Sequence, residues 1–156
     1  MGAGLRLPAV DPRTVPERRG SSYPEPFRGA AGGRVKRALG DAAGLTDFGV
    51  NLVHLPPGAW SSQRHWHSHE DELVYVLEGE LVLITEGGEQ VLGPGMAAGF
   101  PKGRADGHHM INRSGRMAVY LEIGSRRPDE DEATYPDIDM HLGTDGRFRH
   151  KSGEPW

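Results

Sequence analysis

Short apolar runs separated by turn residues form the main pattern of the chain from about residue 45 onward. Residues 48–55 and 72–78 are rich in β-branched, aliphatic and aromatic side chains, which favours strands. Further short strands are expected at residues 81–84, 90–92, 97–100, 109–112 and 117–123. Strands at intervals of roughly 8–12 residues, with glycine and proline between them, predict an all-β sandwich or barrel. The pattern contains no long amphipathic helix.

The same pattern divides the chain into three parts. Residues 1–40 are rich in Arg, Gly and Pro and show no sustained period, so we expect an extended N-terminal arm. This arm either packs along the barrel or a partner, or is a frayed terminus. Residues 41–125 are expected to form the β-barrel. Residues 126–156 are expected to be a C-terminal extension that packs on the barrel, with an edge strand near 137–142.

Composition narrows the class of protein. A length of 156 residues suits one domain, and 23 glycines with 12 prolines indicate many turns. The chain has no cysteine, which excludes disulfides, thiolate metal sites and cysteine nucleophiles and fits a cytoplasmic protein. Charges are interspersed with a net charge of −4, which does not favour a nucleic-acid partner. No apolar run approaches the ~18 residues of a membrane span, and the N-terminus does not resemble a secretory signal.

Candidate chemistry begins in a segment of closely spaced histidines and acidic residues at positions 65–72. Alternate side chains of a strand share a face, so His65 and His67 point the same way, while Trp66 points away from them. Glu72 begins the next strand, and antiparallel pairing would bring its carboxylate opposite the two imidazoles. Two imidazoles and a carboxylate are a natural ligand set for a first-row divalent metal.

A second candidate segment begins at His108. His108 and Asn112 are four residues apart on an expected strand and share a face, so His108 could add a third imidazole to the site. The neighbouring His109 is an alternative to His108. His69, like His109, otherwise lies on the surface or at the mouth of the pocket. Arg64 and Lys102 could meet an anionic substrate there, although solvated surface charge is the simpler interpretation of both.

These residues resemble the two motifs of the cupin family. The first motif is matched by Gly58, His65, His67, Glu72 and Gly79. The second motif is matched by Gly95, Pro101, Gly103, His108 and Asn112. The gap from Gly58 to His65 is one residue longer than the family pattern, and the gap from Gly103 to His108 is two residues longer. The unchanged spacing from His108 to Asn112 favours His108 over His109.

The resemblance covers about residues 45–123 and implies a double-stranded β-helix, or jelly-roll barrel. It implies that His65, His67, Glu72 and His108 hold one divalent metal ion, with Fe, Mn, Ni and Zn all compatible. Within the family, the chain is similar to small single-domain bacterial cupins that are labelled sugar-phosphate isomerases by analogy. Because one fold hosts many functions, the resemblance says less about the reaction than about the fold and the metal.

Three functions fit these expectations. The first is a metal-dependent enzyme acting on a small polar or anionic metabolite, with isomerase, dioxygenase, decarboxylase or lyase chemistry all open. The second is a non-catalytic cupin that binds or senses a small molecule through the same metal. The third is a metal-free barrel with vestigial histidines. Exposed strand edges also favour a homodimer as the assembly.

Overall fold

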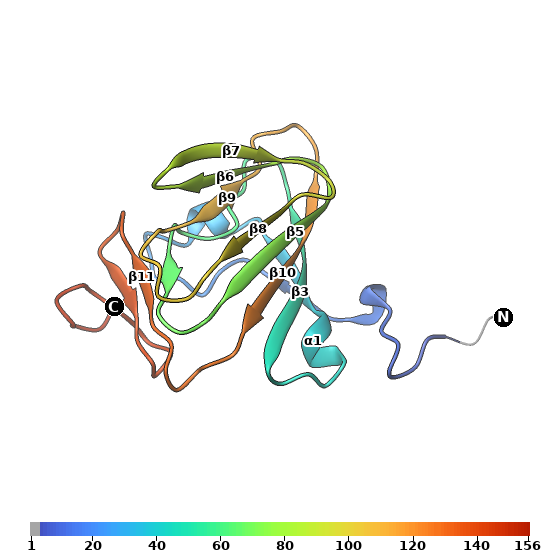
Figure 1. Cartoon of the computed structure of the whole chain (residues 1–156), viewed down its shortest axis with the longest axis horizontal. Helices are drawn as coiled ribbons and strands as arrows, with labels where there is room; N and C mark the ends of the chain where they lie inside the picture. Colours follow the sequence, from blue (N-terminus) through green and yellow to red (C-terminus); the bar gives the residue numbers. More distant parts are fainter. Residues whose placement is uncertain (1–3) are drawn as a thin grey trace.

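The computed structural model describes residues 4–156 and is built mainly of short antiparallel strands (Figure 1). In chain order the elements are η1 (Pro12–Thr14), β1 (Glu17–Arg19), η2 (Gly29–Ala31), β2 (Val35–Ala38), α1 (Leu39–Ala42), β3 (Phe48–Leu55), β4 (Trp66–His67), β5 (Glu72–Glu78), β6 (Leu81–Thr85), β7 (Gly88–Leu92), β8 (Ala97–Phe100), β9 (His109–Ile111), β10 (Ala118–Ser125), β11 (Ala133–Tyr135), β12 (Met140–Leu142) and β13 (Phe148–Arg149). The expectation of an all-β, double-stranded β-helix fold is confirmed.

Two sheets form the walls of the barrel. A six-stranded sheet has the order β1-β2-β3-β10-β5-β8, and a three-stranded sheet has the order β7-β6-β9. The smaller sheet lies across one end of the larger one, above β5 and β8 in the view of Figure 1. All strand pairs in both sheets are antiparallel. The barrel interior is therefore enclosed between strands that are far apart in the chain.

Strand β5 shows why these residues form strands. Its side chains alternate between the interior, where Val74 and Val76 are buried, and the outer face, where Leu73, Tyr75 and Leu77 are each 40% exposed. The buried positions join one apolar core within the barrel. The members of this core are Val53, Leu55, Ala59, Val74, Val76, Leu81, Leu83, Leu92, Met110, Ala118 and Tyr120.

The turn after β5 requires the last glycine of the first motif. Gly79 has a φ of 77°, and a Cβ at this position would lie 2.6 Å from the carbonyl oxygen of Met117. A side chain would therefore meet both backbone strain and a neighbouring strand. The glycine allows β5 to turn directly into β6 while β10 packs closely against it.

The N-terminal segment contributes to the barrel wall. Within the segment expected as an extended arm, β1 pairs with β2, and β2 pairs with β3 along the edge of the six-stranded sheet. Tyr23 and Ala31 from the same segment are buried in a second apolar cluster with Ala133, Tyr135 and Met140. Boundaries at residues 40 and 125 stay a prediction, but both flanking segments pack against the barrel.

The C-terminal segment forms a four-stranded sheet with part of the barrel. Its order is β13-β12-β11-β4, so β11 pairs directly with the short strand β4. Ala133 lies opposite His67 in this register, and Thr134 lies opposite Trp66. The extension thus holds the strand that carries the first histidine motif. No helix among the described residues is long and apolar enough to cross a membrane.

Candidate metal centre

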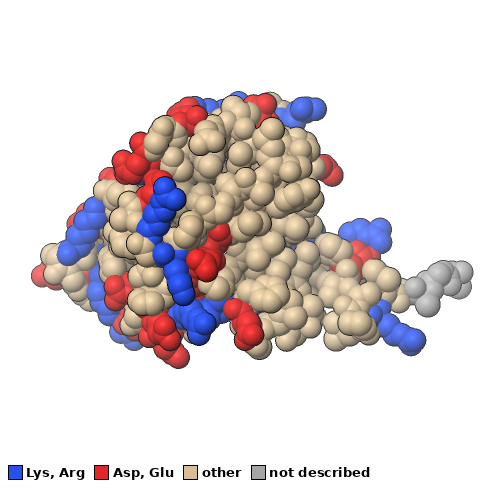
Figure 2. All heavy atoms as spheres, viewed as in Figure 1, with Lys and Arg blue, Asp and Glu red and all other residues tan. Residues whose placement is uncertain are grey.

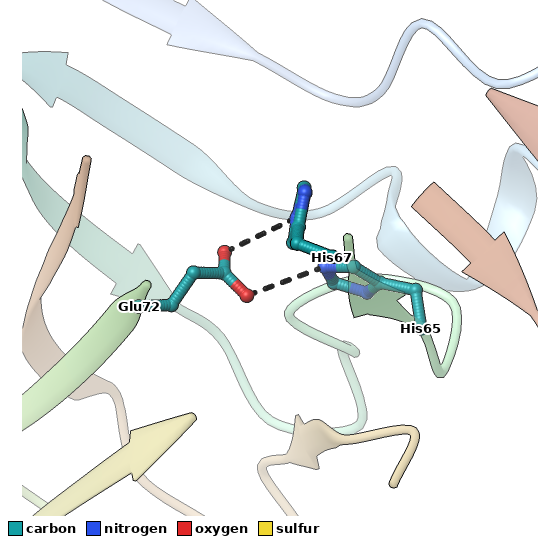
Figure 3. A group of neighbouring side chains, drawn as sticks. All are labelled: His65, His67 and Glu72. Atoms are coloured by element: carbon teal, nitrogen blue, oxygen red, sulfur yellow. Dashed lines mark ion pairs between the residues drawn. The ribbon is translucent and has the colours of Figure 1, made fainter. Parts of the chain in front are cut away.

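Three imidazoles converge on one carboxylate inside the barrel. The Nε2 atoms of His65 and His67 lie 3.7 and 3.6 Å from the Glu72 carboxylate oxygens. Figure 3 shows the two rings directed at opposite oxygens of this carboxylate. His108 Nε2 lies 2.9 Å from Glu72 Oε2. The structure therefore brings together all four residues expected as ligands.

Each of the four side chains is positioned by a different part of the barrel. His67 lies on β4, and Glu72 is the first residue of β5, where it pairs with Phe100 of β8. His65 and His108 form an isolated β-bridge, with reciprocal backbone hydrogen bonds of 2.9 and 3.2 Å. The ring of Phe100 stacks on His108 with the centroids 3.5 Å apart. These contacts restrict the orientation of the imidazoles before any ligand binds.

The Nδ1 atoms of two histidines have partners on the side away from Glu72. His65 Nδ1 lies 2.8 Å from the carbonyl oxygen of Gln63, and His67 Nδ1 lies 2.6 Å from Asp131 Oδ2. A carbonyl can only accept, so His65 Nδ1 carries the proton and Nε2 keeps its lone pair; an ionised Asp131 has the same effect on His67. Such outer partners orient metal-binding histidines.

Asp131 belongs to the C-terminal extension, just before β11. Its Oδ1 also accepts hydrogen bonds from the backbone N–H groups of His69 and Glu70, at 2.8 and 3.2 Å. The Asp131 carboxylate is thus fixed by the turn that joins β4 to β5. Sequence reasoning missed this residue because it lies 64 positions from His67, and no local spacing connects the two.

The electrostatics of the centre favour the protonation states that a metal needs at His65 and Glu72, whereas at His67 they favour the proton that a metal would displace. Burial lowers the pKa of His65 to about 4, against the opposing charge of Glu72. Burial also opposes charging of His67, but the carboxylates of Glu72 and Asp131 raise its pKa above the ordinary value. Burial raises the pKa of Glu72, but contact with His108 and the other imidazoles outweighs it and lowers the pKa to about 2. Glu72 is therefore ionised near neutral pH, as a metal ligand must be.

An unpartnered buried atom supports the fit of a metal. Glu72 Oε2 is buried and makes no hydrogen bond in the described part of the chain, although His108 Nε2 lies nearby. Ligand atoms of His65, His67 and Glu72 all lie within 4.8 Å of one another, as a shared cation requires. Nitrogen and oxygen donors without sulfur suit Fe, Mn, Ni or Zn alike. The residues present therefore fit one divalent ion.

A cavity of about 320 Å³ opens beside this cluster. His67, Glu72 and His108 form part of its wall. Its other lining residues come from β4, β6, β7, β8 and the loop before β9: Trp66, Leu83, Thr85, Gln90, Ala97, Ala98, Gly99, Phe100, Pro101, Arg104 and Asp106. The volume is at the low end of that of small-molecule sites, and polar groups among apolar walls are typical of them.

The structure separates His108 from the alternative His109. The His109 ring packs edge-on against Trp60, with centroids 4.8 Å apart, and its Nδ1 lies 3.0 Å from the carbonyl oxygen of Ser62. Burial lowers the pKa of His109. His69 is exposed, and its Nδ1 lies 2.9 Å from the Ser68 hydroxyl. Neither residue lines the cavity beside Glu72.

The position of Trp66 differs from the one predicted from the sequence. Strand alternation placed it away from the two histidines, yet it forms part of the cavity wall together with His67. Strand β4 contains only Trp66 and His67, and alternation over so short a strand does not keep neighbouring side chains apart. Arg104 and Asp106 of the cavity wall were also missed, because a loop has no period from which a direction can be predicted.

Comparisons with known proteins agree with this architecture. The family description "Cupin domain" matches residues 51–124. The chain is 44% identical to a protein of Silicibacter pomeroyi described as a sugar phosphate isomerase from a cupin superfamily. The TM-score is 0.90, and the match covers 96% of each chain. It is 36% identical to a proposed sugar phosphate isomerase of Acidithiobacillus ferrooxidans, with a TM-score of 0.72 over 78% of this chain and 77% of that one.

A more distant structure shows the same fold alone. The polyketide cyclase RemF of Streptomyces resistomycificus is 23% identical, with a TM-score of 0.59 over 77% of this chain and 80% of that chain. A search of curated proteins finds no match. Fold and site together define a double-stranded β-helix protein with a His/Glu cluster that could bind a metal. The chain belongs to the cupin family.

Proposed function

We propose that this cupin is a metal-dependent enzyme that acts on a small, polar, anionic metabolite, with sugar-phosphate isomerisation as the favoured reaction. The observation that carries the proposal is the convergence of three imidazoles on Glu72, with His67, His108 and Glu72 at the wall of a cavity of about 320 Å³. The ligand roles of these four residues are part of the proposal. The 44% identical sugar phosphate isomerase supports the choice of reaction.

The bound metal would polarise a carbonyl or hydroxyl oxygen of the substrate. The chain itself supplies a second ionisable group, because Asp106 lines the same cavity as Glu72. Asp106 Oδ1 accepts a hydrogen bond of 2.9 Å from the backbone N–H of Glu86, which holds the carboxylate in place. An isomerisation must move a proton between neighbouring carbons, and a fixed carboxylate at the cavity wall is a suitable base.

The first test is metal content. Purified protein, stripped and then reconstituted separately with Fe(II), Mn(II), Ni(II) and Zn(II), should retain about one equivalent of at least one metal. Turnover of aldose and ketose phosphates should then be followed by NMR in deuterated water, where isomerisation through a proton transfer introduces deuterium. Asp106→Asn should lose turnover and keep its metal. Protein that retains none of these metals would contradict the proposal that the enzyme depends on a metal.

A non-catalytic binding or sensing cupin is the alternative. It shares the same cavity and metal, and it differs only in that no bound compound is converted. Saturable binding of phosphorylated sugars to the metal-loaded protein, without product in the NMR assay for any of them, would favour this alternative.

The proposed assembly is a homodimer that uses the outer face of the large sheet. Leu73, Tyr75 and Leu77 of β5 are exposed there, and Figure 2 shows a broad area without charged side chains over β5 and β10. Contiguous exposed apolar surface of this kind is typical of interaction sites. Analytical ultracentrifugation should give twice the chain mass of 17.0 kDa, and Leu73→Glu should shift it to the monomer. A monomeric wild-type protein would contradict this.

A further inference from the structure

One cation at the cavity wall has no partner in the described part of the chain. Arg104 lines the cavity together with His67, Glu72 and His108, and its side chain is exposed. Among residues 4–156, no hydrogen bond or ion pair involves its guanidinium group. A guanidinium group presents several N–H donors in a planar fork that matches the oxygens of a phosphate or carboxylate. Arg104 is therefore free to bind an anion that enters the cavity.

The other two basic residues near the cavity mouth are not available in the same way. The guanidinium of Arg64 contacts both carboxylate oxygens of Asp137 at 2.7 Å and Glu86 at 2.8 Å. Hydrogen bonds from Arg64 to Asp137, and to a smaller extent to Glu86, raise the pKa of Arg64 above its ordinary value. Lys102 is exposed and does not line the cavity. Both residues looked equivalent in the sequence, but neither faces the cavity with a free charge.

The loop that carries Arg104 is the part of the chain that departs from the cupin pattern. The two extra residues lie between Gly103 and His108, the stretch that contains both Arg104 and Asp106. Gly103, with a φ of 72°, donates its N–H to the carbonyl oxygen of His67 at 2.8 Å. On the other side, Asp106 accepts from Glu86. Both flanks of Arg104 are therefore anchored, and the longer loop presents the side chain at the cavity wall.

The charges of the cavity define the substrate that would fit. A bound divalent metal would offset the charges of Glu72 and Asp106, and Arg104 adds a further positive charge beside them. We propose that Arg104 binds the phosphate group of a phosphorylated sugar-like substrate, whose hydroxyl or carbonyl oxygens face the metal centre. This inference rests on the proposed function and names the residue that would select its substrate class. A phosphate carries more charge and more acceptor oxygens than a carboxylate, so it gains most from the guanidinium.

Binding to the metal-loaded protein tests the inference without requiring turnover. Triose, pentose and hexose phosphates are titrated by calorimetry, and each is compared with the corresponding free sugar. A hexuronate tests whether a carboxylate can replace the phosphate group, and inorganic phosphate tests binding of the phosphate group alone. Three variants are compared with the wild type: Arg104→Gln, Arg104→Lys and, as the matched control on the same loop, Lys102→Gln. Metal content is measured for every sample.

Arg104→Gln should weaken binding of the tightest phosphate ester by about 10- to 100-fold, leave the weak binding of the free sugar unchanged and keep the metal. Arg104→Lys should recover part of the loss, and Lys102→Gln should bind as the wild type does. Equal binding by wild type and Arg104→Gln would overturn the inference, as would a wild type that prefers free sugars or hexuronate to phosphate esters. A wild type that holds no metal would instead identify a failure of the proposed function.

Discussion

The two ends of the barrel interior are built from the same strands but differ in chemistry. Along β5, the inward side chains run from Val76 and Val74 to Glu72, and along β10 they run from Tyr120 to Glu122. At one end, the buried side chains are almost all apolar and pack against one another. At the other end, ionisable side chains adjoin the candidate metal centre and a small cavity.

This difference separates stability from function. Apolar burial contributes favourably at about 25 cal/mol per Å², whereas buried ionisable groups destabilise the fold unless they have partners. Glu122 has partners within the protein, because Lys36 Nζ lies 2.5 Å and Asn51 Nδ2 lies 3.1 Å from its Oε2. Within residues 4–156, Glu72 Oε2 makes no hydrogen bond and lies 2.9 Å from His108 Nε2 in the candidate metal centre. We therefore expect variants of the apolar end to change stability and variants of the polar end to change metal binding.

The largest effect is expected for His67→Ala. It removes one of the proposed ligands, so metal retention after dialysis should fall from about one equivalent to none, while the metal-free protein keeps its fold. The matched control is His69→Ala, since His69 is exposed and lies outside the cluster. Metal analysis with far-ultraviolet circular dichroism checks both. Full metal occupancy in His67→Ala would show that the cluster is not the metal site.

Leu81→Ala tests the apolar end. Leu81 is fully buried in the barrel core, so its truncation should lower the free energy of unfolding by about 2–5 kcal/mol through lost burial and a residual cavity. Metal stoichiometry should stay at the wild-type value. Urea denaturation measures the first quantity, with Val91→Ala as control because Val91 is 58% exposed. Loss of metal with only a small loss of stability would break the separation between the two ends.

Asp131→Asn tests the carboxylate behind His67. The asparagine keeps a similar shape but accepts less strongly from His67 Nδ1, so metal affinity should fall about 10- to 100-fold. Competition with a chelating indicator dye measures this affinity. Asp129→Asn is the matched control, because its side chain is exposed two residues away and, among residues 4–156, no hydrogen bond or ion pair joins it to His67. An unchanged affinity in Asp131→Asn would leave Asp131 with a purely structural role.

The smallest effect is expected for Glu122→Gln. Burial raises the pKa of Glu122, but the Lys36 ammonium group outweighs it and holds that pKa below the ordinary 4.5. A depressed folded-state pKa contributes stability that is present above pH 4.5 and lost as the pH falls further. Metal-free Glu122→Gln should therefore be less stable than the wild type by about 1 kcal/mol at pH 7. This difference should shrink below pH 4.5 in urea denaturation curves; a difference independent of pH would contradict the charge-based account.

Regular parts of the molecule were predicted better than irregular ones. Residues 48–55 and 72–78 were expected as strands and agree with β3 and β5, since β-branched and aromatic residues favour strands locally. Residues 97–100 were also expected as a strand and agree with β8, between turn residues on both sides. Strands β1 and β2 were missed within the arm, because their mostly charged or half-exposed residues show no apolar alternation. Tertiary pairing with β3 makes β2 a strand despite its sequence.

The sequence by itself determined the fold class and the order of the motif residues, because strand alternation and turn glycines depend on near neighbours. Only the tertiary structure decided which side chains meet across the barrel. It brought His108 rather than His109 to Glu72 and placed Asp131 beside His67 Nδ1. It also paired Arg64, while Arg104 has no partner among residues 4–156. Those contacts join segments separated by 36 to 73 positions, and their geometry depends on how the sheets and loops pack together.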